Sequence, residues 1–137
     1  MLPHAHVLVA DDDPQLLSVV AESLTHLGAE VVRASSGAEL IEHLAQAGPF
    51  DLIVTDIGMP WMSGLQAMHA ARTAGLGIAV IVMTALRDQR IPALVRRLGA
   101  NAVLLRKPFT LSELESAASK LLTPQTSGIG PPAPQRP

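Results

Sequence analysis

The sequence predicts an α/β protein built on a parallel sheet, and two patterns support that prediction. Short, continuous apolar runs recur along the chain, and longer segments with helical periodicity separate them. Apolar runs without alternation are typical of strands that helices cover on both faces. Right-handed crossovers between such strands favour a doubly wound, three-layer sandwich of the flavodoxin-like type, with five strands in the order 2-1-3-4-5 and five helices.

Five runs are candidate strands, and four of them end at or near a polar or charged residue. The runs cover residues 7–10, 31–32, 52–54, 78–83 and 102–105, of which the second is the weakest.

The helix signals lie between these runs. Asp13 followed by Pro14 predicts an N-cap and a first helical residue, and Gly28 ends that helix. Ser36 and Glu39 have the spacing of a capping box, which predicts a second helix that fades before residue 48.

Three further helices follow from the same kind of signal. Ser63 is placed to cap a helix that runs to about residue 73. Asp88 is expected to open a fourth helix that ends at Gly99, with Pro92 tolerable only in its first turn. Thr110 and Glu113 form another capping box, which opens a last helix ending near residue 122.

Composition sets the class of protein. The chain has 137 residues, a formal net charge of −2 and no cysteine. These values indicate one domain, predicted over residues 1–122, and they exclude disulfides and thiolate metal sites. They also give no sign of direct nucleic-acid binding. No apolar run approaches the ~18–20 residues that span a bilayer, so a cytoplasmic protein without membrane contact is expected. Residues 123–137 hold five of the eleven prolines, which indicates a disordered tail or a truncated linker.

Polar side chains follow four of the candidate strands. They are Asp11 and Asp12, Asp56, Thr84 and Lys107. Because the carboxyl ends of parallel strands meet at one edge of a sheet, these groups should converge. Clustered carboxylates repel one another unless a cation or protonation relieves the repulsion, and all-oxygen ligands favour Mg²⁺. Acids, an ammonium and a hydroxyl are also the groups that an incoming phosphoryl group requires.

A simpler interpretation of the acidic triplet also exists. Asp11, Asp12 and Asp13 could form only a solvated turn and a helix cap, and Asp13 is assigned to the cap in either case. The joint placement of the whole set at one edge of the sheet favours a site.

Four stretches resemble the receiver domain of two-component response regulators. They are VLVADDDPQLL, DLIVTDIGMPWMSGLQ, VIVMTA and LLRKPFT, and the similarity covers roughly residues 5–122. The resemblance implies that Asp56 is the phosphorylated residue. It further implies a Mg²⁺ site formed by Asp11, Asp12, Asp56 and the backbone carbonyl of Gly58, with Asp11 acting mainly through water.

The resemblance assigns the remaining polar groups as well. Thr84 would be the switch hydroxyl and Lys107 the cation that contacts the phosphoryl group. The bond between Lys107 and Pro108 is expected to be cis, because it is typically cis in this family.

Three departures from the family pattern involve four positions. Leu104 stands where many members carry an aromatic switch residue, and Ser63 stands where many carry Asp. Gly58 and Leu86 flank the site without a group that could hold a hydrolytic water, which predicts slow self-dephosphorylation.

The predicted function is a phosphorylation-dependent signalling switch rather than a turnover enzyme. The expected partners are a sensor histidine kinase or a histidine phosphotransfer protein, and a downstream effector or output domain. A homodimer through the fourth helix, fifth strand and fifth helix is one arrangement that the resemblance allows. The alternatives are a receiver that binds partners without phosphorylation, and an aspartyl phosphohydrolase. We disfavour the hydrolase because its second acid would fall at Gly58.

Overall fold

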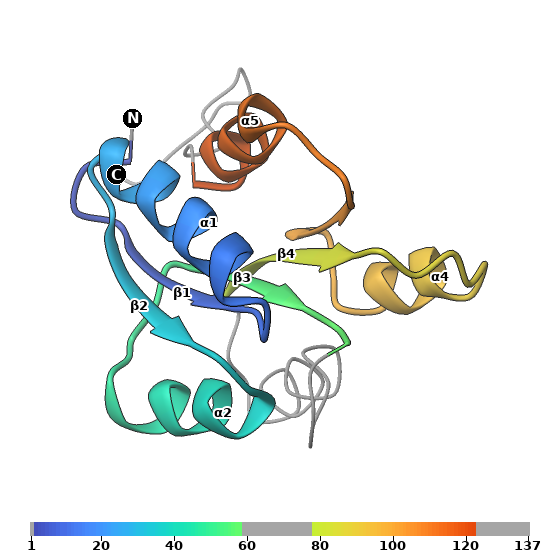
Figure 1. Cartoon of the computed structure of the whole chain (residues 1–137), viewed down its shortest axis with the longest axis horizontal. Helices are drawn as coiled ribbons and strands as arrows, with labels where there is room; N and C mark the ends of the chain where they lie inside the picture. Colours follow the sequence, from blue (N-terminus) through green and yellow to red (C-terminus); the bar gives the residue numbers. More distant parts are fainter. Residues whose placement is uncertain (1, 59–77, 123–137) are drawn as a thin grey trace, which may run out of the picture.

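Five parallel strands form a single sheet at the centre of the molecule (Figure 1). The structure is a computed structural model that describes residues 2–58 and 78–122. The strands are β1 (His6–Ala10), β2 (Glu30–Ala34), β3 (Leu52–Asp56), β4 (Ala79–Thr84) and β5 (Ala102–Arg106). Their order in the sheet is β2-β1-β3-β4-β5, which confirms the predicted flavodoxin-like topology.

Four of the five predicted helices fall within the described residues. They are α1 (Pro14–His26), α2 (Gly37–Gln46), α4 (Ile91–Arg96) and α5 (Leu111–Leu122). The helix predicted over residues 63–73, together with its Ser63 cap, lies outside the described residues, as does the predicted tail. None of the described helices combines the length and the apolar character needed to cross a membrane.

The strands place alternate side chains on opposite faces of the sheet, so the molecule has two apolar layers. In β1, Val7 and Val9 pack with α1 and α5, whereas Leu8 and Ala10 pack with α2 and α4. All four side chains are completely buried. Burial on both faces explains why the central strands are continuous apolar runs rather than alternating ones. Figure 1 shows α1 and α5 close together over the sheet and α2 well away from them.

Local capping signals fix the helix starts. The Asp13 carboxylate accepts hydrogen bonds from the amides of Gln15 and Leu16, at 3.0 and 3.4 Å. At the start of α5, Thr110 Oγ1 accepts the Glu113 amide at 3.0 Å, and Glu113 Oε1 accepts the Thr110 amide at 2.8 Å. This reciprocal pair is the capping box that the sequence predicts.

The fourth helix starts later than the sequence predicts. α4 begins at Ile91, and the Asp88 carboxylate instead accepts the Arg90 amide at 2.9 Å and the Arg90 guanidinium at 2.6 Å. These bonds, first the side-chain one and then the backbone one, lower the pKa of Asp88 to about 2. Asp88 therefore shapes the turn before the helix and does not cap it.

Candidate functional site

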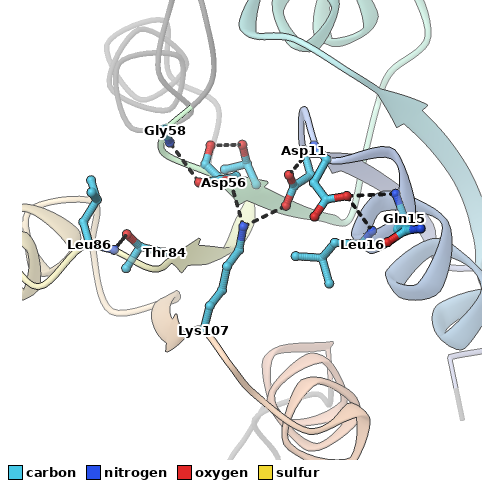
Figure 2. A network of polar contacts seen from close by, with 10 residues as sticks. Asp11, Gln15, Leu16, Asp56, Gly58, Thr84, Leu86 and Lys107 are labelled. Carbon is cyan, nitrogen blue, oxygen red and sulfur yellow. Dashed lines mark hydrogen bonds and ion pairs between the residues drawn. The ribbon is translucent and has the colours of Figure 1, made fainter.

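The carboxyl edge of the sheet gathers side chains from four strands, as the sequence predicts (Figure 2). Asp11 directly follows β1, Asp56 is the last residue of β3, Thr84 is the last of β4, and Lys107 directly follows β5. The register aligns Asp56 with Met83 of β4, and Thr84 with Arg106 of β5. Residues nearly one hundred positions apart in the chain thus meet at one edge.

Asp56 is held by two hydrogen bonds. The ammonium of Lys107 donates to Oδ2 at 2.8 Å, and the amide of Gly58 donates to Oδ1 at 2.9 Å. The residue is 9% exposed, and its side chain is 13% exposed. The carboxylate is therefore oriented by the protein while it keeps a small opening to solvent.

Asp11 is the buried acid of the cluster, with no exposed surface. Its Oδ1 accepts the Asp13 amide at 2.9 Å, and its Oδ2 accepts the Lys107 ammonium at 3.1 Å. Burial raises the pKa of Asp11, the nearby charge of Asp56 adds to that effect, and the two hydrogen bonds oppose it. A cation near Asp11 would therefore stabilise the charged form of its carboxylate.

Lys107 bridges the two acids. Burial acts to lower the pKa of its ammonium, but the hydrogen bonds to Asp56 and Asp11 outweigh that effect, so the pKa is raised. Lys107 therefore stays charged at neutral pH. The peptide bond from Lys107 to Pro108 is cis, as the resemblance implies.

The three acids are close enough to share a cation. Asp12 is exposed, and one carboxylate oxygen from each of Asp11, Asp12 and Asp56 lies within 4.8 Å of the others. An all-carboxylate donor set of this kind suits a hard divalent cation. The carbonyl of Gly58 remains a predicted ligand, because the contact that the structure records for this residue is its amide with Asp56.

Thr84 is 1% exposed, and its hydroxyl oxygen accepts the amide of Leu86 at 2.9 Å. Its backbone carbonyl accepts the Lys107 amide at 2.7 Å, which ties the ends of β4 and β5 together. The side chain of Thr84 is thus fixed at the same edge as Asp56, at the end of β4 and directly before the loop that leads to α4.

Sequence reasoning missed one residue at this edge. Arg106 Nη1 donates to the carbonyl of Leu86 at 3.2 Å. A signal was present, because Arg106 lies two positions after Leu104 in a strand and therefore on the same face of the sheet. Surface arginines are common, however, and position alone does not select a partner.

Comparisons with known proteins identify a family for this chain. The family model described as response regulator receiver domain matches residues 7–119. The transcriptional regulatory protein KdpE of Mycobacterium tuberculosis is 36% identical over 107 residues, which cover 78% of this chain and 46% of that protein. A probable chemotaxis protein CheY of Rhizobium etli is 31% identical over 113 residues, which cover 81% of this chain and 87% of that protein.

A solved structure gives the same result. A response regulator receiver protein from Sinorhizobium medicae superposes with a TM-score of 0.78 at 30% identity, covering 89% of this chain and 97% of that one. The chain spans between 26% and 55% of the length of several other curated relatives.

Proposed function

The chain belongs to the response regulator receiver domain family, and from this premise we propose that it is a signalling switch operated by phosphorylation of Asp56. The observation that carries the proposal is the contact of Asp56 with Lys107 at 2.8 Å, beside two further acids at the carboxyl edge of the sheet. An oriented carboxylate with an adjacent ammonium is suited to attack phosphorus.

The proposed phosphodonor is a phosphohistidine on a sensor kinase or phosphotransfer protein. An oxygen of Asp56 forms a bond to phosphorus, the phosphorus–nitrogen bond breaks, and the imidazole nitrogen leaves with the electron pair. The product is a mixed anhydride on Asp56. Lys107 already contacts Oδ2 of Asp56, so its ammonium can hydrogen-bond an oxygen of the transferred group with little movement.

Asp11, Asp12 and Asp56 are the side chains that would hold a magnesium ion. Their oxygens lie within 4.8 Å of one another, and a bound cation would offset the burial that raises the pKa of Asp11. When bound, Mg²⁺ supplies charge neutralisation for the phosphoryl oxygens.

Thr84 would transmit the effect of phosphorylation from Asp56 to the rest of the domain. A phosphoryl group on Asp56 offers new acceptor oxygens to the Thr84 hydroxyl, which lies at the end of β4, directly before the loop leading to α4. A downstream effector or an output domain would detect the altered surface around α4, β5 and α5, and a homodimer could form there. Such a switch acts by shifting the populations of two states.

Replacement of the acceptor tests the proposal. Asp56→Asn should abolish labelling by radioactive acetyl phosphate with Mg²⁺, or by a phosphorylated kinase. Asp51→Asn, at the other end of β3, is the matched control and should label like the wild type. Wild-type-level labelling of Asp56→Asn would reject the assignment.

The same experiment distinguishes the alternatives. A receiver that binds partners without phosphorylation would show no labelling in the wild type. An aspartyl phosphohydrolase would turn over free phosphomonoesters continuously instead of retaining a stable label.

A further inference from the structure

Leu86 is hydrogen-bonded on both sides of its Cα atom. Its amide donates to the Thr84 hydroxyl at 2.9 Å, and its carbonyl accepts from the Arg106 guanidinium at 3.2 Å. The Leu86 residue is 53% exposed, so packing of its side chain does little to hold the loop. These two backbone contacts therefore connect a buried hydroxyl at the site to a cation on β5.

The alternation of β5 explains how Arg106 reaches this loop. Ala102 and Leu104 pack in the apolar layer of α2 and α4, whereas Leu105 packs in the layer of α1 and α5. Arg106 therefore continues the face of Ala102 and Leu104. On that face it is the next residue towards the carboxyl edge, and it is aligned with Thr84 of β4.

Leu104 contributes no polar group to this face. Its side chain is half-buried against the layer that contains Ile91 and Val95 of α4, and it has no hydrogen-bonding atom. The Arg106 guanidinium is the polar group that bonds β5 to the loop carrying Leu86. A displacement of the Thr84 hydroxyl can therefore be transmitted to β5 through Leu86 and Arg106, without an aromatic ring.

We propose that Arg106 is a positioning residue that acts through Leu86 on the Thr84 hydroxyl and carries displacement of that hydroxyl to β5 and α4. Its role in transmitting the signal rests on the proposed function of Asp56. Its role in holding the loop does not.

Hydrogen-bond energetics explain why the contacts should move together. The Leu86 amide is part-buried, so losing its Thr84 acceptor would leave a donor unpaired. When Thr84 turns towards a phosphoryl oxygen, the Leu86 amide should follow it. That movement changes the position of the Leu86 carbonyl relative to Arg106, and the guanidinium must follow it or release it.

The first test needs no phosphodonor. Hydrogen exchange of the Leu86 amide is measured by NMR in the wild type, in Arg106→Met and in Arg96→Met. Arg106→Met keeps an unbranched but shorter side chain and removes every donor, whereas Arg96→Met makes the same replacement at an exposed site on α4. We expect Leu86 to exchange about fivefold faster in Arg106→Met, and at the wild-type rate in Arg96→Met. Equal rates in the two variants would overturn the proposal.

The second test adds acetyl phosphate and Mg²⁺. All three proteins should label on Asp56, and the accompanying amide shift changes in Ile91–Arg96 and Ala102–Arg106 should shrink by at least about half in Arg106→Met only. Normal labelling with undiminished shift changes in Arg106→Met would overturn the transmission role alone. Absence of labelling in the wild type would instead reject the proposed function. The hydrogen-exchange measurement would still test whether Arg106 holds the loop at Leu86.

Discussion

One aspartate directly precedes β3 and another is its last residue, and the two have different environments. Asp51 lies before the amino end, where it is exposed and its Oδ2 accepts the amide of His6 at 2.8 Å. Asp56 lies at the carboxyl end, is 9% exposed and meets the Lys107 ammonium and the Gly58 amide.

The same residue type therefore has two roles, which are set by its place in the sheet. At the amino edge a carboxylate fastens two strands. At the carboxyl edge, the ends of β1, β3 and β4 and the residue after β5 bring acids, a hydroxyl and an amine together. The comparison indicates that the reactivity expected of Asp56 depends on the strand ends that converge around it, and not on the residue type alone.

The largest expected effect is a difference in Mg²⁺ response between the two edges. Added Mg²⁺ should raise the free energy of unfolding of the wild type by up to about 2.7 kcal/mol at one hundred times its Kd. Asp12→Asn should lose most of this gain because it removes one of the three clustered carboxylates. Asp51→Asn should keep it. Urea denaturation with and without Mg²⁺ measures the gain. An equal loss in both variants would show that the Mg²⁺ response does not depend on the carboxyl edge.

The second effect concerns the ammonium between the acids. Lys107→Met should lower the free energy of unfolding of the metal-free protein by about 2 kcal/mol, because it leaves Asp11 and Asp56 without their cation. The Lys107 side chain is 19% exposed, so the cost should fall below that of a fully buried pair. Asp51→Ala, which removes one exposed acceptor, should cost less. Chemical denaturation in the presence of a chelator compares them, and equal costs would contradict the prediction.

A third prediction concerns the lifetime of the phosphorylated state. A side chain at position 58 would start 3.5 Å from Asp56 Oδ1, and the backbone there lies outside the left-handed region. Gly58→Asn should therefore place an amide where it can hold a water, and it should speed self-dephosphorylation about tenfold, or about 1.4 kcal/mol. Loss of label after removal of the phosphodonor gives the rate. A wild-type half-life of seconds would contradict the slow hydrolysis expected from Gly58 and Leu86.

The smallest effect is a pH dependence that comes from Asp11. Burial raises its folded pKa above 3.8, so Asp11 binds a proton more readily in the folded protein than in the unfolded chain. Its stabilising contribution is present below pH 3.8 and is lost as pH rises through the raised pKa. The effect is small because the hydrogen bonds from Asp13 and Lys107 oppose the shift.

Asp11→Asn isolates this contribution in the metal-free protein. The stability of the variant relative to the wild type should increase between pH 3.5 and pH 7, as measured by urea denaturation at each pH. Asp51→Asn serves as the control at the amino edge. If the relative stability of Asp11→Asn falls as pH rises, the pKa of Asp11 is lowered by folding and the prediction is wrong.

The sequence was sufficient for the sheet and for the convergence of Asp11, Asp56 and Lys107 at its carboxyl edge. Strands buried on both faces leave continuous apolar runs, and polar residues at their ends are conspicuous for that reason. Asp13 was also predictable as a cap, because its carboxylate bonds amides only two and three residues away. Contacts that depend on backbone direction or on a few adjacent residues were thus accessible.

Contacts made by the long, flexible side chains of Arg90 and Arg106 were not. The turn formed by Asp88 and Arg90 delays the start of α4, since the guanidinium competes for the carboxylate that would otherwise cap the helix. The bond from Arg106 to Leu86 joins residues twenty positions apart through a long side chain with several rotamers. Sequence pattern does not choose among those rotamers.

The strict alternation of β5 also limits how this protein can change in length. Inserting or deleting one residue within Ala102–Arg106 would swap the layers in which Leu104 and Leu105 pack, and it would turn the ammonium of Lys107 away from Asp56. Natural variation in this strand should therefore consist of substitutions, with gaps confined to the loops on either side.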